Sequence, residues 1–369
     1  MENQFEMNDN EKKLLNAIGN YPEISLRELL NHTDYKWVST VAKKIEKFRE
    51  LKILYGPRTY LDFGKLCKNP IHWILCCIEF DPSYDTVMSY LKLIEPLTWV
   101  FPVLSPYKRS LNVGYLSSND AEVRNLLQIL KNSNIISDFT VRVLRHRIIL
   151  ENPNFFGDPI PTLDNLLEPC EFPDISFGGH DTEWSECDIR TLFHLLKGEK
   201  SPKLIEILKK EKNVYNRKWT YEQVKYSYRK IITNELIERR YALNPFSLNQ
   251  CSEFILFVRT DSAQMTQKIL CNFGRGGRIL KEHMFCDDWG VIGCCSHSSF
   301  LIDLMYKLDL IDEIKEKELH HVRSLPHGIQ YTLENTELDY YDFDKQILEY
   351  PYDLMREKIN RELECELVV

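Results

Sequence analysis

The sequence predicts an α+β protein made of two tandem copies of one plan, a winged helix-turn-helix followed by a ferredoxin-like βαββαβ domain. The first observation is a basic helical pattern, with apolar residues at positions i, i+3, i+7 and i+10, that occurs twice. Its members are Val38, Val41, Ile45 and Phe48 in the first copy and Tyr221, Val224, Tyr228 and Ile231 in the second. The second observation is one apolar spacing shared by the helix that opens each copy, in Leu14, Leu15 and Ile18 and in Leu192, Phe193 and Leu196. The third is a change in the spacing of apolar residues after each helical region, where segments with strand spacing begin to alternate with segments with helix spacing.

The first copy begins with helical patterns and a turn. Ser25 and Glu28 have the capping-box spacing at the start of the second helix. A Gly56-Pro57 turn between two apolar runs predicts a small hairpin, which would be the wing. We expect helices at about 9–19, 25–31 and 34–51 and the hairpin at 53–63. The βαββαβ elements are then expected at 71–80, 85–95, 98–105, 110–117, 120–132 and 136–150.

The plan restarts after a proline-rich stretch. We expect helices at about 186–197, 201–211 and 219–235, a hairpin at 236–248, and then elements at 252–260, 262–272, 278–285, 290–296, 298–308 and 314–323. The residues after 326 fit neither copy, are rich in acids and should include a strand and a helix near 352–364. The predicted domains are a winged helix-turn-helix at 1–66, a ferredoxin-like domain at 67–150, a linker at 151–185, a second winged helix-turn-helix at 186–248, a second ferredoxin-like domain at 249–326 and an acidic C-terminal extension at 327–369.

Composition places the chain among ordinary globular proteins. It has 369 residues, of which 43% are hydrophobic, and no apolar run approaches the roughly 20 residues that span a bilayer. The N-terminus lacks a signal-peptide layout, and the 11 cysteines lie mostly in apolar segments, which is typical of free thiols in a reducing compartment. We therefore expect a cytoplasmic protein that contacts no membrane. The net charge of −8 is unevenly distributed, with basic helices and an acidic end.

Two segments carry a resemblance to a known family. They are EKKLLNAIGNYPEISLRELLNHTDYKWVSTVAKKIEKFRELKIL at 11–54 and the more divergent KNVYNRKWTYEQVKYSYRKIITNELI at 212–237. With the βαββαβ pattern that follows each, this resembles the Lrp/AsnC family of prokaryotic transcription regulators, duplicated in one chain over about 9–150 and 186–325. The resemblance implies an archaeal regulator that binds double-stranded DNA and pairs its ferredoxin-like domains within one chain or between chains. It also implies a small-molecule effector, although only CDDWG at 286–290 is close to the family's effector-site motif.

The third helix of each copy supplies the candidate DNA contacts. Such a helix reads base edges with its N-terminal exposed residues while lysines and arginines hold phosphates. In the first copy the candidates, the last of them in the wing, are Lys36, Trp37, Ser39, Thr40, Lys43, Lys44, Lys47 and Arg58. In the second copy they are Arg217, Lys218, Thr220, Gln223, Lys225, Arg229 and Lys230. The alternatives are an ordinary solvated helix face and a winged helix used only for packing.

Two other sets of residues suggest weaker hypotheses. Cysteines and histidines lie close together in the sequence at His283, Cys286, Cys294, Cys295 and His297, but their spacing matches no zinc template. Because neighbouring residues of a strand point to opposite faces, we expect buried thiols there and no metal site. The segment NFGRGGRI at 272–279 lacks the elements of a phosphate loop and should be a helix-to-strand turn.

A second resemblance suggests an enzyme. Siroheme decarboxylases use the same two-domain plan and place histidine and arginine near a porphyrin, and here His146, His321, Tyr107 and Arg109 are the faint counterparts. We interpret these four as surface polar residues at turns. The sequence thus favours a DNA-binding regulator that is not an enzyme, with no catalytic residue, metal or cofactor. A tetrapyrrole enzyme and a protein-interaction adaptor without DNA stay open as alternatives.

Overall fold

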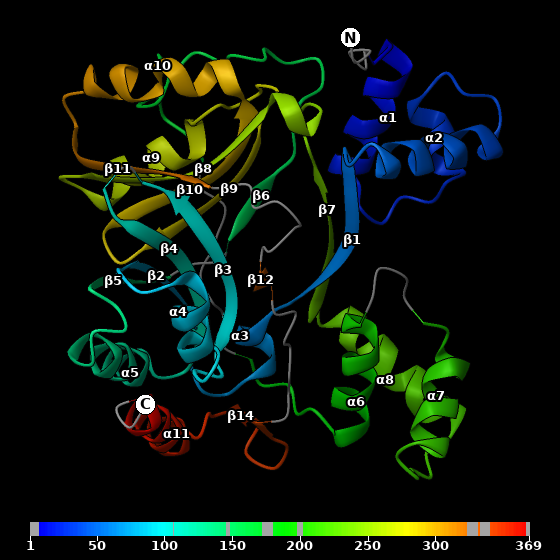
Figure 1. Ribbon diagram of the computed structural model, residues 1–369. Coiled ribbons are helices and arrows are strands. Elements are labelled where there is room, and N and C mark those ends of the chain that lie inside the picture. The colour runs from blue at the N-terminus through cyan, green and yellow to red at the C-terminus, as the bar shows by residue number, and fades with distance from the viewer. Residues whose placement is uncertain are drawn as a thin grey trace.

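The computed structural model describes residues 7–105, 107–144, 148–171, 180–197, 202–322, 331–332 and 340–366. Within them the largest element is a ten-stranded antiparallel sheet, flanked by helices. This confirms the predicted α+β class. In Figure 1 the sheet and its covering helices occupy one side of the molecule, and two helical regions joined by a long two-stranded ribbon occupy the other.

The two helical regions form where the helical patterns predict them. Their elements are α1 (Asp9–Asn20), η1 (Glu28–His32), α2 (Val38–Glu50), β1 (Leu54–Leu61) and α3 (Phe63–Leu66), and later α6 (Glu186–Leu196), α7 (Leu204–Asn213), α8 (Tyr221–Thr233), β7 (Ile237–Leu243) and η2 (Leu248–Gln250). Capping boxes begin α1 at Asn8, α6 at Ser185 and α8 at Thr220. The helix expected from Ser25 is reduced to the 3-10 turn η1, although Ser25 and Glu28 do exchange the predicted capping hydrogen bonds.

The two predicted hairpins are wrong. β1 does not turn back on itself but pairs along its length with β7 of the other helical region, from Leu54 opposite Leu243 to Leu61 opposite Ile237. Gly56, with a φ of +93°, and Pro57 form an irregularity within β1, where the register shifts. A turn-like dipeptide therefore kinks a strand here, and the two expected wings become one ribbon.

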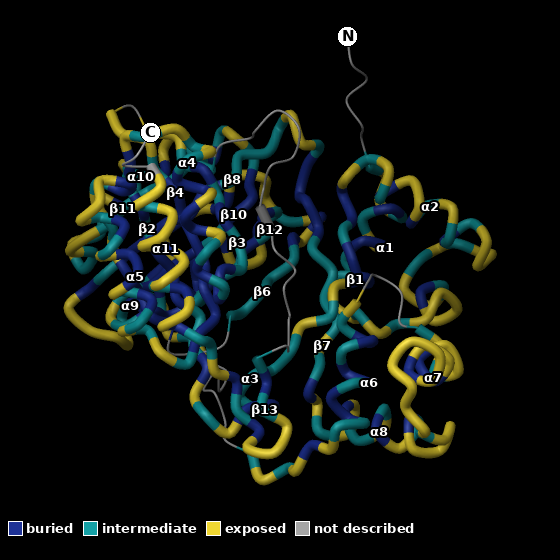
Figure 2. Tube along the Cα trace, turned by 60° about the horizontal axis from the view of Figure 1, so that its bottom comes forward, coloured by how far each residue is buried: buried dark blue, intermediate teal, exposed yellow. Residues whose placement is uncertain are grey.

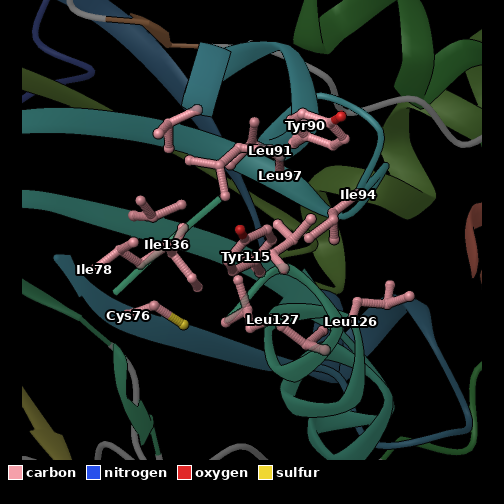
Figure 3. Packing of buried hydrophobic residues seen from close by; sticks show 14 of the residues in the cluster. Cys76, Ile78, Tyr90, Leu91, Ile94, Leu97, Tyr115, Leu126, Leu127 and Ile136 are labelled. Atoms are coloured by element: carbon pink, nitrogen blue, oxygen red, sulfur yellow. The ribbon is translucent and has the colours of Figure 1, made fainter. Parts of the chain in front are cut away.

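The first half of the large sheet has the strand order β5-β2-β4-β3. Its elements are β2 (His72–Phe80), α4 (Tyr84–Leu91), β3 (Leu97–Leu104), β4 (Arg109–Ser117), α5 (Asp120–Asn132) and β5 (Asp138–Val143). Alternate side chains point to α4 and α5, so that Cys76, Ile78 and Tyr115 pack against Leu91, Leu127 and other apolar residues of the helices (Figure 3).

The second half has the order β11-β8-β10-β9. Its elements are β8 (Cys251–Thr260), α9 (Ala263–Asn272), β9 (Leu280–Cys286), β10 (Trp289–His297), α10 (Ser298–Asp309) and β11 (Ile314–Val322). Phe254, Leu256 and Ile292 point toward α9 and α10. The segment NFGRGGRI connects α9 to β9, as expected, with Gly274 and Gly276 at positive φ.

The two halves are joined on both sides and face each other. β3 pairs with β11, and on the other side β6 (Ile149–Glu151) pairs with β9. The single strand expected at 136–150 is therefore divided, because β5 pairs with β2 whereas β6 pairs with the other half. Leu75 of the first half and Phe257 of the second belong to one apolar cluster between the halves. The result is four layers, helices, sheet, sheet and helices (Figure 1).

The C-terminal extension packs into both parts of the molecule. Its described elements are β12 (Tyr331–Thr332), β13 (Tyr341–Asp342), β14 (Ile347–Leu348) and α11 (Tyr352–Glu366). Tyr352, Met355 and Ile359 of α11 are buried in the core of the first half-sheet. Tyr341 and Leu348 are buried in the core formed with α6, α7 and α8. The extension is acidic, as expected, but its apolar face completes two cores.

Within the part of the chain that the structure describes, no helix is both long enough and apolar enough to cross a bilayer.

Candidate functional site

The predicted contacts on α2 lie in two environments. Lys36, Ser39, Lys43 and Lys47 are exposed, and Trp37, with 71% of its surface accessible, caps the N-terminus of the helix. Much of the tube of α2 is coloured as exposed in Figure 2. Lys44 instead lies 2.7 Å from the carboxylate of buried Glu11 in α1. Its charge holds the helices together.

The remaining predicted contacts of the first copy, Thr40 and Arg58, also have defined places. Thr40 is half-buried in the first turn of α2. Arg58 is not in a wing, because it lies in β1 directly opposite Arg240 of β7. We therefore correct its assignment: Arg58 belongs to the ribbon between the two helical regions.

On α8 much of the predicted basic face serves the fold. Thr220 and Gln223 exchange capping hydrogen bonds at the start of the helix. Lys230 lies 2.8 Å from buried Asp188 and over the ring of Trp184. The other four residues are at or near the surface, where Arg217 pairs with Glu186 and Lys225 pairs with Glu222, and where Lys218 and Arg229 are exposed.

A different set of residues meets between the half-sheets, at the end that faces the β1–β7 ribbon. Gly293 lies in the middle of β10 on the inward side, since its neighbours Ile292 and Cys294 pack against α9 and α10. Gly293 is nevertheless not fully buried. A Cβ placed on Gly293 would make ordinary van der Waals contact, among the described residues, with Glu282 alone, at 3.6 Å from its carbonyl oxygen and 3.9 Å from its Cβ. We call the space on this inward side of Gly293 the inter-sheet recess.

The recess has apolar and aromatic surroundings. Inward-pointing residues that are only partly buried pack against the cluster between the sheets, and these include Trp73, Trp99, Ile148 and Met284. Trp73 and Trp99 keep part of their surface accessible between the two sheets. Their rings are flat and apolar.

The ribbon brings charged and polar groups to the edge of the recess. Arg240 donates a hydrogen bond to the carbonyl of Ile148 at 3.3 Å, and its guanidinium lies 5.2 Å from the ring centre of Tyr60. Burial raises the pKa of Glu282, while nearby Arg240 and Arg58 lower it in part. Burial and the charge of Glu282 also raise the pKa of Tyr60. Two arginines, a tyrosine and a glutamate thus lie close to one another at the edge of the recess.

Deeper between the sheets is a network of buried polar groups. Arg142 lies between the rings of Phe257 and Trp289, 4.5 Å from each, and forms an ion pair of 3.0 Å with Glu318. His320 Nδ1 lies 2.9 Å from Asn112 Oδ1, and burial lowers the pKa of this histidine. The network joins β5 and β4 to β11 and holds the two half-sheets in register.

The four residues matched to siroheme decarboxylases lie elsewhere. Tyr107 is 94% exposed at the turn between β3 and β4, and Arg109 donates to the carbonyl of Pro82 at 2.8 Å. His321 is in β11, and its buried Nδ1 has no hydrogen-bond partner among the residues that the structure describes. His146 lies outside the described residues. Gly293 and Glu282 were not predicted from the sequence. Alternation along β9 and β10 indicates that both face the same side, but which side is inward depends on how distant segments pair.

Cysteines form no metal centre among the residues described, where no group of three or more potential ligands meets. Cys294 and Cys295 point to opposite faces, as expected. Cys294 packs toward the helices, whereas Cys295 contacts Asn244 at 3.9 Å on the inward side. Burial raises the pKa of Cys294 far above its usual range.

Comparisons with known proteins give distant matches of structure. No family model matches the sequence, and no curated protein is similar to it. The siroheme decarboxylase NirDL matches over 96% of this chain and 100% of its own, at 11% identity and a TM-score of 0.49. A leucine response regulatory protein from Mycobacterium tuberculosis matches over 37% of this chain and 92% of its own, at 15% identity and a TM-score of 0.29. An AsnC family regulator from Agrobacterium tumefaciens matches over 37% and 89%, at 14% identity and a TM-score of 0.30.

One expectation is corrected by these matches. The sequence predicted that the chain is not an enzyme, but the structures that match nearly its whole length are those of an enzyme, while the regulators match only about two fifths of it.

Proposed function

We propose that this chain is an enzyme that binds a tetrapyrrole carrying carboxylate groups in the inter-sheet recess and removes a carboxyl group from it, as a siroheme decarboxylase does. This was the alternative to the DNA-binding regulator. The observation that carries the proposal is the partly exposed Gly293 in the middle of an inner strand, where a Cβ would contact only Glu282 among the described residues and clash with none of them.

The surroundings of the recess suit such a substrate. A flat, conjugated ring gains most from aromatic and apolar walls, and a few placed polar groups fix its orientation. Trp73, Trp99 and Met284 offer the walls. Arg58 and Arg240 lie at the edge, Arg240 in an ion pair with Glu238, and guanidinium groups bind carboxylates through paired hydrogen bonds.

The recess also depends on both halves of the chain. One wall comes from β8 to β11, the other from β2 to β5, and the ribbon adds one strand from each helical region. We propose that this arose by tandem duplication, with the domain division at 1–66, 67–150, 186–248 and 249–326 and a linker at 151–185. The single site would then lie between two copies in one polypeptide. The free thiols of the described cysteines support a cytoplasmic setting.

Filling the recess tests the proposal. Gly293→Leu should lower the affinity for iron-uroporphyrin III about ten- to a hundredfold, because overpacking a fitted site costs about 1–3 kcal/mol. Gly293→Ala, which adds one methyl group, should have a smaller effect. Binding is measured by the change in tetrapyrrole absorbance, and thermal unfolding checks the fold. If the wild type does not bind iron-uroporphyrin III, or if the Gly293→Leu variant binds it as tightly as the wild type does, the proposed site is wrong.

DNA binding stays a second candidate because of one feature, the exposed basic N-terminal face of α2. Lys36, Trp37, Ser39 and Lys43 all lie on the surface there. Binding of duplex DNA should then weaken steeply with salt, and replacing Lys36 and Lys43 by alanine should make that dependence shallower by about one unit per contact. An unchanged dependence, or no binding at low salt, would remove this candidate.

A further inference from the structure

Glu282 borders the recess beside Gly293. It lies on the inward side of β9, opposite Gly293 of β10 and opposite Leu150 of β6. The next inward residue of β9 is Met284, which belongs to the apolar surroundings of the recess. The strand pairing therefore places one carboxyl group beside the recess and among apolar side chains.

This carboxyl group lacks the partners that usually hold a buried acid in its charged form. Among the described residues, no hydrogen bond and no ion pair joins the side chain of Glu282. The nearest charges come from the ribbon, where Arg240 is already paired with Glu238 at 2.6 Å and Arg58 stands opposite Arg240. Burial has a larger effect on the pKa of Glu282 than these two arginines have, so the pKa is raised. The acid keeps its proton to a higher pH than an exposed glutamate does.

The other titratable groups around the recess are poorer proton donors. Tyr60 holds its proton more tightly than usual, because burial raises its pKa. Burial lowers the pKa of His320 of β11, so this histidine takes up a proton less readily than a free one, and its Nδ1 lies 2.9 Å from Asn112 Oδ1. Glu151 of β6 pairs with Lys281 at 2.8 Å on the opposite side of β9. Glu253 of β8 already interacts with other groups of the protein. Glu282 is therefore the group whose position and raised pKa suit the donation of a proton to a ligand in the recess.

We infer that Glu282 is the proton donor of the decarboxylation, an assignment that rests on the proposed function. The bond between the carboxylate carbon and the methylene carbon of an acidic side chain of the substrate breaks, and carbon dioxide leaves. The electron pair of that bond stays on the methylene carbon, which takes the proton of Glu282 and becomes a methyl group. Glu282 is left as a carboxylate and regains a proton from water. The step needs no oxidant or reductant.

The test separates binding from turnover in the full chain. Glu282→Gln keeps the size of the side chain and a hydrogen-bond donor but has no acidic proton to give. It should bind iron-uroporphyrin III within about threefold of the wild type, while its turnover of siroheme, measured as loss of one carboxyl group by mass spectrometry, should fall about 10²- to 10⁴-fold. The wild-type rate should fall as pH rises through the pKa of Glu282, and the variant should lack this pH dependence. Glu282→Asp should restore part of the rate.

The outcomes distinguish the two proposals. Glu362→Gln, at an exposed position of α11, serves as the matched control and should behave as the wild type. If the wild type turns siroheme over and Glu282→Gln keeps both the rate and the pH dependence, the role of Glu282 is refuted and the proposed function stands. If the wild type neither binds nor converts a tetrapyrrole, the proposed function fails and the role of Glu282 with it.

Discussion

Two lysines that the sequence assigned to DNA are instead partners of buried carboxylates. Lys44 pairs with Glu11 and Lys230 with Asp188, and in both pairs the acid is at most 4% exposed. Burial alone would raise the pKa of Asp188, but hydrogen bonds from Lys230, Ser227 and Ser185 outweigh it and lower the pKa. A charge that is buried and satisfied in this way becomes costly when its partner is removed.

Lys230→Ala should therefore destabilise the protein by about 3–5 kcal/mol, the usual cost of leaving a buried charge unpaired. Lys225→Ala on the same helix loses only a 3.5 Å pair with exposed Glu222 and should change stability by about 0.5 kcal/mol or less. Urea denaturation measures both. Because a lowered pKa stabilises the folded state above the unfolded pKa, the cost should shrink as pH falls and Asp188 takes up a proton. Equal effects of the two changes would contradict this account.

Glu282 should show the opposite dependence of stability on pH. Its folded pKa lies above the ordinary value of 4.5, so the folded state binds the proton more tightly than the unfolded chain does. The stabilisation is complete below the unfolded pKa and is lost as pH rises through the folded pKa. Glu282→Gln should thus be more stable than the wild type at alkaline pH, with a smaller difference in acid. Thermal unfolding of both proteins across a range of pH measures this. If the difference in stability between the variant and the wild type does not change with pH, the pKa of Glu282 is not raised.

At the scale of elements, α11 is part of the first core despite its acidic composition. Met355 and Ile359 are fully buried against that core, whereas Leu354 of the same helix is 54% exposed. Met355→Ala or Ile359→Ala should cost about 2–5 kcal/mol of stability, and Leu354→Ala much less. Denaturant unfolding compares the three variants. A helix that merely solubilises the chain would tolerate all three changes equally.

The elements with local signals were predictable from the sequence, and those with distant partners were not. The apolar period placed α5 and α8 to within about two residues, and alternation placed β8 and β10. The ribbon of β1 and β7 was not predicted. Leu54 pairs with Leu243, and no residue near Leu54 indicates a partner so far away in the sequence. The sequence predicted β5 and β6 as one strand for the same reason. They are separate strands only because β5 pairs with β2 whereas β6 pairs with β9.

The same limit explains the candidate site. The basic residues of α2 could be found from the sequence because a helix fixes which residues share a face. Gly293 and Glu282 stand out only once β9, β10 and the opposite half-sheet are in place, because an inward strand position says nothing by itself about whether the space beyond it is filled.

At the scale of the whole molecule, four connections interlock the two halves of the chain. β3 pairs with β11, β6 with β9 and β1 with β7, and α11 from the C-terminal end completes the core of the first half-sheet. The ion pair of Arg142 and Glu318 crosses the space between the sheets. A unit held together in this way should unfold cooperatively.

The recess adds a consequence for ligand binding. Because its walls come from both half-sheets and from the ribbon, a bound tetrapyrrole should stabilise all of these parts together. At a free concentration of one hundred times the dissociation constant, iron-uroporphyrin III should add about 2.7 kcal/mol to the free energy of unfolding. Calorimetry should show one transition that moves to higher temperature as a whole. Gly293→Leu should keep the single transition of the free protein but lose the shift, because the fold remains and the space is gone. Two transitions, of which the ligand moves only one, would mean that the ligand binds to one part of the molecule and that the recess is not a site shared by both halves.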